Sequence, residues 1–350
     1  MKTMNRMRMR EYCCCCEMMA MTMKGSVYII GINETKRNNM KRIALAIAVL
    51  LSINISNIWA EQNSTNTSSV RYVKAPRFAR PLVEKWITEY AKTQPGVEFQ
   101  IAKGNQNQGT IDLNVVFDNQ DTKTEDFSHT IVYFGEFAVL PITASGSEAA
   151  KVLEGKHLNS KKLKQLYFLN DDFDEDVKKI KQFEKLVIYS GSNATSVAAS
   201  FAHNFGEESS NFRGKRISGD DLFLNTALTK DPLGVSFNAL PNIFDLQSRH
   251  IKDDLTIIGI DVKKALEESF SDKVSLDELI AVLENGKVSE IAVEKIGVSY
   301  NGGDDAVNQF LQWVLTDGTK YNHEFGLLNL DNKLTQVQIE KVKDILTAQK

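Results

Sequence analysis

The sequence predicts an α/β fold in which strands alternate with helices, and three observations lead to it. Short apolar runs bounded by glycine, proline or polar residues recur along residues 70–350. Between them lie longer segments whose apolar residues repeat at helical spacing. No internal repeat of fixed period is found. Strands separated by helices are typical of helices layered on a largely parallel sheet.

The chain is expected to be exported through a cleaved signal peptide at residues 40–60. Met40 begins a short basic segment, residues 43–51 are an unbroken apolar run, and Ala60 is a suitable small residue for cleavage. The apolar run is far shorter than the roughly 20 residues that cross a bilayer, so a permanent anchor is the weaker interpretation. Residues 1–39 are then expected to be an upstream extension without a structural role.

All four cysteines lie together at residues 13–16, ahead of the predicted signal. Four adjacent thiols lack the spacing that lets them surround one zinc ion. The mature chain is therefore expected to contain neither a disulfide nor a cysteine nucleophile. The absence of a cysteine at the cleavage region also predicts a product without a lipid tether.

The mature chain is acidic. Residues 1–60 carry nine basic and three acidic side chains, which leaves 33 basic against 42 acidic residues after cleavage. Such a chain is a poor partner for nucleic acid. Its 290 residues are enough for one large or two modest domains.

The elements are expected in the following order. Residues 61–69 are a polar leader, and a helix begins at Pro81, with the apolar face of Leu82, Trp86 and Tyr90, and stops at Pro95. Later helices are predicted at residues 160–169, 196–205, 220–228, 304–315 and 336–346. Strands are predicted at residues 97–102, 110–117, 131–142, 186–189, 235–237, 255–260 and 291–300, with the fourth helix and the strand at 235 joined by a turn at residues 231–234.

One pattern of strand, polar loop and helix at residues 186–205 suggests an anion site. Its loop, residues 190–195 (the second loop), follows the carboxyl end of a strand and precedes a helix. Backbone N–H groups at the start of a helix lack partners, and the helix dipole is positive there. The candidates are the donors of this loop, Ser190, Gly191, Ser192, Asn193 and Thr195. An ordinary Ser/Thr helix cap explains the same residues, and spacing alone favours that alternative.

A series of short motifs resembles the phosphate-binding family of periplasmic solute-binding proteins, the receptors of ABC transporters. The series begins with RYV at residues 71–73, a first loop at residues 74–78, and PLVEKWITEYAKTQPGVEFQI. It continues with GEFAVLPI from Gly135, GSNATS from Gly191, DPLGVSF from Asp231 and FLQWVLTDGTKYNHEFGLLNL from Phe310. Each motif is weak, and their common order over some 260 residues carries the resemblance.

The resemblance implies a two-lobed type 2 periplasmic binding protein, with mixed sheets flanked by helices and a ligand cleft between the lobes. By this analogy residues 70–142 begin lobe 1, residues 143–237 form lobe 2 and residues 238–350 complete lobe 1. The implied partners are inorganic phosphate or a similar oxyanion and the membrane permease of an ABC transporter. We expect a periplasmic monomer without a cofactor.

The ligand loops depart from the family pattern. No arginine precedes the second loop, and Ala75 and Pro76 replace small hydroxyl residues in the first loop. Lys74 and Arg77 are the candidates for positive charge, and Asp118 for the acceptor of a ligand proton. A carboxylate there favours a protonated oxyanion over sulfate. Phosphate, another anion and a lost ligand all remain open.

The sequence gives little support for a metal site or for an enzyme active site. The five histidines are scattered without metal-binding spacing, and the acidic run at residues 171–176 lacks the glycine and final glutamate of a calcium loop. No nucleophile elbow or phosphate-loop lysine is found, so we expect no enzyme activity. The alternative to a receptor is a relative that has lost its ligand and acts as an envelope interaction protein.

Overall fold

A computed structural model describes residues 70–103, 111–118, 129–169, 180–193, 196–301 and 304–348. The chain divides into two units, 1–67 and 68–350, and all of these residues belong to the second. The predicted signal, the polar leader, residues 104–110, the acidic run and Thr195 lie outside the described residues.

The predicted elements are present with modest shifts at their ends. The strands are β1 (Arg71–Lys74), β2 (Phe99–Ile101), β3 (Ile111–Phe117), β4 (His129–Ala144), β5 (Val187–Gly191), β6 (Lys215–Ile217), β7 (Gly234–Ala239), β8 (Leu255–Ile257) and β9 (Ala292–Asn301). The α-helices are α2 (Arg80–Thr93), α3 (Glu148–Leu153), α4 (Ser160–Tyr167), α5 (Ala198–Asn204), α6 (Leu222–Lys230), α7 (Leu240–Ile243), α8 (Leu276–Asn285), α9 (Asp305–Trp313) and α10 (Asn332–Ala348). A 3₁₀ turn, η1 (Arg77–Ala79), precedes α2. Helices α3, α7 and α8 and strand β6 were not predicted.

These strands form a mixed sheet in the order β2-β1-β3-β9-β4-β7-β5-β6, with β8 pairing to β4 as well. The outer pairs, β1 with β2 and β3, and β5 with β6 and β7, are parallel. The long strands β4 and β9 instead pair antiparallel to each other and to their neighbours. A largely parallel sheet was expected from the alternation, whereas the mixed sheet implied by the family resemblance is confirmed.

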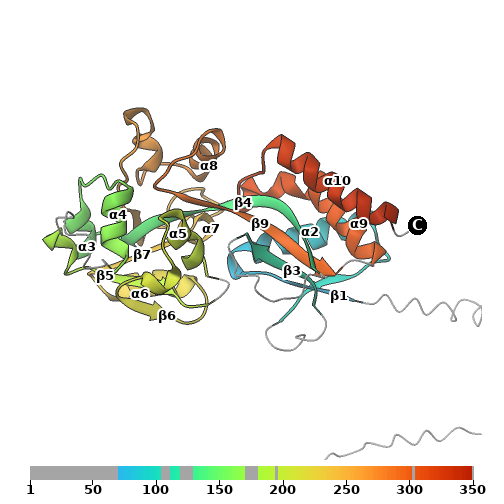
Figure 1. Cartoon of the computed structure of the whole chain (residues 1–350), viewed down its shortest axis with the longest axis horizontal. Coiled ribbons are helices and arrows are strands. Elements are labelled where there is room, and N and C mark those ends of the chain that lie inside the picture. The colour runs from blue at the N-terminus through green and yellow to red at the C-terminus, as the bar shows by residue number, and fades with distance from the viewer. Residues whose placement is uncertain are drawn as a thin grey trace, which may run out of the picture. The chain divides into compact units, whose positions relative to one another are not determined.

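The strand directions bring two sets of carboxyl ends toward the middle of β4 (Figure 1). Strands β1 and β3 run in the same direction as β4, whereas β5, β6 and β7 run against it. The last residue of β3 lies opposite Ile296, which pairs with Gly135, and the last residue of β7 pairs with Val139. The loops that follow the two sets of strands therefore face each other.

Strand β4 passes through a glycine and a proline, two residue types that weaken or interrupt strands. Gly135 sits at a register shift, where an added Cβ would lie 2.7 Å from the carbonyl oxygen of Leu328. Pro141 pairs with Phe237, and its carbonyl accepts a hydrogen bond from Ile258. The strand continues past Pro141 to Ala144, two residues beyond the predicted end at residue 142, because a proline forfeits only its own N–H.

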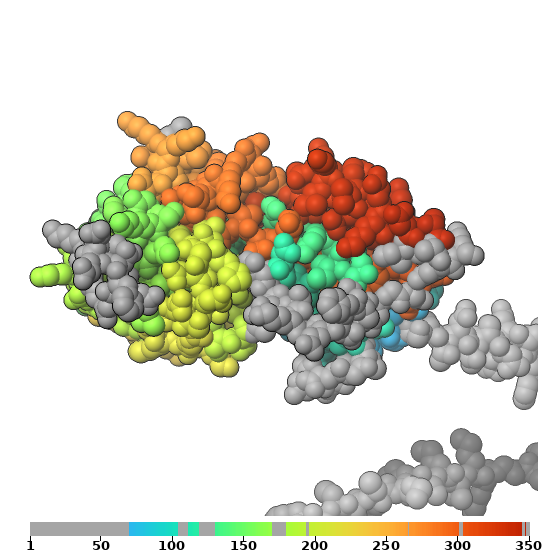
Figure 2. Space-filling view, viewed as in Figure 1, coloured from blue at the N-terminus to red at the C-terminus, as the bar shows by residue number. Residues whose placement is uncertain are grey.

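The two ends of the sheet carry different helices. In Figures 1 and 2 the C-terminal helices α9 and α10 lie at one end and α6 at the other. Trp86 of α2 is 1% exposed and donates through Nε1 to the Gly318 carbonyl at 2.8 Å. At the other end Phe201 of α5 stacks on Phe237 of β7, with ring centroids 4.2 Å apart. The predicted amphipathic helices thus bury the faces that their spacing indicates.

A search of the described part of the chain for a helix long and apolar enough to cross a membrane finds none.

Candidate anion-binding site

The second loop begins at the buried carboxyl end of β5. Ser190 is 1% exposed, and its Oγ has no hydrogen-bond partner among the described residues. Gly191 follows in a confined space, where an added Cβ would lie 2.0 Å from Ser196 Oγ and 2.7 Å from Asp221 Oδ1. Only glycine fits at this position without displacing its neighbours.

Asp221 binds the residues that lead from the second loop into α5. Its carboxylate accepts from Ser196 Oγ at 2.7 Å and from the Val197 N–H at 3.0 Å. The Ala198 N–H donates to Ser196 Oγ at 3.2 Å. Burial raises the pKa of Asp221 to about 6, against the stabilising effect of these two donors. The donors at positions 196–198, which a helix start would offer to an anion, therefore have internal partners.

The exposed residues of the second loop bond to the segment 217–219. The N–H of Ser192 donates to the Ile217 carbonyl at 3.0 Å, and its hydroxyl donates to the same oxygen at 3.3 Å. Asn193 Nδ2 donates to the Gly219 carbonyl at 2.7 Å. Both side chains reach the surface, whereas Thr195 lies outside the described residues. The loop is therefore held against the segment that leads into α6.

The first loop reaches this same segment. Lys74 is exposed at the end of β1, and Arg77 in η1 places Nε 3.9 Å from Asp220 Oδ2. Strands β1 and β6 are six strand-to-strand steps apart in the sheet, which would separate them by roughly 29 Å if the sheet were flat. The curl of the sheet thus brings Arg77 to the residues that hold Asn193.

Asp118, the predicted proton acceptor, is engaged elsewhere. It follows β3 and accepts from the Tyr133 hydroxyl, and Lys295 Nζ lies 3.4 Å from its Oδ2. Burial, with the nearby Asp118 charge as a second cause, raises the pKa of Glu294 to about 7. Asp118 thus belongs to a charged cluster on β4 and β9, and none of its hydrogen bonds or ion pairs with described residues joins it to the two loops.

Sequence reasoning missed Asp220 and Asp221. They were interpreted only as the start of a helix, which they also form, because Asp220 Oδ1 accepts from the Leu222 N–H at 2.9 Å. Two adjacent acidic residues ahead of an apolar run are a common helix-start signal. Nothing local in the sequence indicates that their carboxylates turn toward the two loops.

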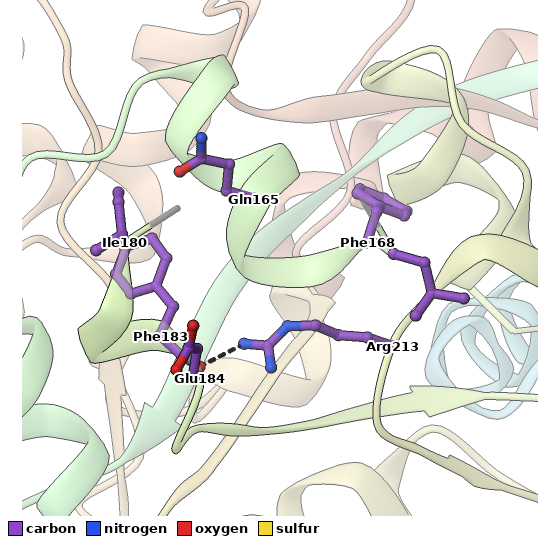
Figure 3. A pocket seen from close by; sticks show the side chains of 7 residues that line it. Gln165, Phe168, Ile180, Phe183, Glu184 and Arg213 are labelled. Carbon is purple, nitrogen blue, oxygen red and sulfur yellow. Dashed lines mark hydrogen bonds between the residues drawn. The ribbon is translucent and has the colours of Figure 1, made fainter. Parts of the chain in front are cut away.

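A separate hollow of about 290 Å³ is lined by Phe168, Ile180 and Phe183 beside Arg213 (Figure 3). The Arg213 guanidinium donates to the carbonyls of Leu166, Leu186 and Phe183. The Arg213 side chain therefore stabilises the fold by binding three backbone carbonyls. No cluster of three potential metal ligands occurs among the residues that the structure describes.

Comparison with known proteins gives a match in structure alone. No family model and no curated protein sequence matches the chain. A protein described as a phosphate ABC transporter substrate-binding protein, from Clostridium perfringens with bound phosphate, superimposes with a TM-score of 0.52 and 10% identity, covering 75% of this chain and 100% of that one.

Two further structures resemble the chain less closely. An ABC-type phosphate transport receptor from Vibrio cholerae gives a TM-score of 0.48 at 8% identity, covering 74% of this chain and 100% of its own. A possible phosphate binding protein from Planctomyces limnophilus gives 0.44 at 10% identity, with 80% and 99% covered. The Clostridium match shows a shared fold, so the resemblance inferred from the sequence is confirmed at that level.

Proposed function

We propose that this protein is an extracytoplasmic solute-binding protein that captures phosphate or a similar oxyanion for an ABC-type transporter. The observation that carries the proposal is the meeting of Arg77 with the segment that holds the second loop. Residues predicted from two distant motifs converge there, at the carboxyl ends of strands, where ligands of open α/β sheets bind.

The proposed binding groups are those of the two loops. Arg77 and Lys74 would supply positive charge, and Ser192 and Asn193 polar side chains at the surface, with Ser190, Gly191 and Thr195 as the further ligand-binding candidates of the second loop. Asp118 is retained as a candidate acceptor, although its carboxylate already has two partners. The likeness to the Clostridium perfringens protein, described with bound phosphate, supports this choice of ligand.

The remaining parts of the proposal follow from the sequence and the fold. A cleaved signal peptide ending near Ala60 would deliver a periplasmic monomer that presents its ligand to a membrane permease. The fold is shared with a protein described as a substrate-binding protein, which supports a role without catalysis. The lobes assigned to residues 70–142, 143–237 and 238–350 would close on the ligand by a hinge motion.

Anion binding can be tested through the thermal stability of the purified protein. A ligand that binds only the folded state at a hundredfold excess over its Kd stabilises it by about 2.7 kcal/mol. We expect phosphate to raise the melting temperature by several degrees. Arg77→Gln and Ser192→Ala should each reduce this rise, and Lys92→Gln, which removes an exposed charge on α2, should leave it unchanged. No rise with millimolar phosphate, sulfate or molybdate would refute the proposal.

One observation favours a second candidate function. The donors of Ser196 and Val197 are already occupied by Asp221, as they would be in a relative that no longer binds an anion. Such a protein would act in the cell envelope through its surface. It would show no anion-dependent stabilisation, together with recovery of the same partner in pull-downs from wild-type and Arg77→Gln cells.

A further inference from the structure

Arg77 already has a negative partner. Its side chain is 56% exposed, and Asp220 is its ion-pair partner among the described residues. The 3.9 Å between Nε and Oδ2 is too long for a hydrogen bond. The guanidinium therefore feels the charge of Asp220 but is not bound tightly to it.

Asp220 is held in place for this role by the backbone around it. Its Oδ1 accepts from the Leu222 N–H at 2.9 Å, and its carbonyl accepts from the Phe223 N–H at 2.9 Å. Its side chain is 21% exposed. Gly219 precedes it with a φ of 114°, and Asn193 binds the carbonyl of that glycine. Contacts of the residues before and after Asp220 thus hold its carboxylate in place beside Arg77.

The neighbouring Asp221 also pairs with groups that could bind an anion. Its carboxylate accepts hydrogen bonds from the Ser196 hydroxyl and the Val197 N–H, which follow the second loop. Two consecutive residues therefore place carboxylates on groups in or beside the two loops that would attract an anion. A like charge fixed in a site weakens the binding of an anion.

We propose that Asp220 is an internal competitor for Arg77: its carboxylate is the counter-ion of this guanidinium, and an anion has to bind Arg77 against the repulsion of that fixed carboxylate. This inference rests on the proposed function and adds a residue that limits affinity. It also gives Asp220 the opposite role to that of a carboxylate accepting a ligand proton, since loss of such an acceptor would weaken binding.

The test is phosphate binding by calorimetry with the full chain at low salt and pH 8. Asp220→Asn removes the charge but keeps an oxygen for the Leu222 N–H, and Asp220→Ser is a second variant that can also cap this helix. We expect both to bind phosphate about threefold to fivefold more tightly than the wild type, because a nearby like charge is removed. Asp253→Asn, which removes an exposed carboxylate from the turn before β8, is the control and should bind as the wild type does.

The outcomes separate the inference from the proposed function. Tighter binding by both variants that is lost again when Arg77→Gln is added supports the inference. Phosphate binding by both variants while the wild type shows none also supports it. Unchanged or weaker binding by folded variants, while the wild type binds, overturns the inference and leaves the function standing. Absence of binding in the wild type and in both variants overturns the two together.

Discussion

Replacing Gly191 with alanine tests the confined geometry at the end of β5. The new Cβ would lie 2.0 Å from Ser196 Oγ and 2.8 Å from Ser196 Cβ, and 2.7 Å from Asp221 Oδ1. Rotation of the serine hydroxyl relieves only the first contact, so the backbone has to move and the Ser196–Asp221 hydrogen bond is lost. Overpacking costs about 1–3 kcal/mol and a hydrogen bond to a charged group about 1.5–3 kcal/mol. We expect a total loss of about 3–5 kcal/mol in the free energy of unfolding.

The assay is urea unfolding at pH 7, followed by circular dichroism and compared at equal m-values. Gly96→Ala is the matched control, because an added Cβ at Gly96 meets nothing within 4 Å and its φ is not positive. That variant should stay within about 1 kcal/mol of the wild type. A loss below about 1 kcal/mol for Gly191→Ala would show that the space between β5, Ser196 and Asp221 is not confined as described.

Two further predictions concern buried polar groups. Asp221, with its pKa raised from 3.8 to about 6, binds its proton more tightly in the folded state, so this contribution to stability is complete below pH 3.8 and is lost as the pH rises through 6. Asp221→Asn should remove a step of about 3 kcal/mol between pH 4 and pH 7 in the unfolding free energy, and an unchanged pH dependence in urea titrations would contradict this. Trp86→Phe should cost about 2–4 kcal/mol, because it leaves the Gly318 carbonyl unpaired and opens a cavity. Trp313→Phe, at a half-buried position, should cost less than half as much. Equal losses of stability in thermal unfolding would contradict the importance of the hydrogen bond from Trp86 to Gly318.

Local patterns predicted the elements whose neighbours in sequence decide them. The face of Leu82, Trp86 and Tyr90 and the stop at Pro95 predicted α2 within two residues of its end. Helix α8 was missed, although Ser275 and Glu278 form a capping box, a signal that is visible in the sequence. Helix α8 was therefore missed because a local pattern was overlooked, and not because a long-range contact decides it.

The candidate site was predictable only in part. Polar composition and position between a strand and a helix singled out the second loop, and Arg77 was chosen from its place in the first. The partners of these residues were not predictable. Asp118 was paired with a ligand by analogy, yet Tyr133 and Lys295 hold it, because β3 and β9 align only in the folded sheet.

From its sequence alone this chain was determined to be an α/β protein with helices and strands in a known order, because periodicity and turn residues act over a few positions. The tertiary structure alone decided that β4 and β9 pair antiparallel in the middle of the sheet and that Asp220 meets Arg77. Those contacts depend on how the sheet curls, which is set by the packing of segments far apart in the chain. Charges brought together in this way leave no pattern within either segment.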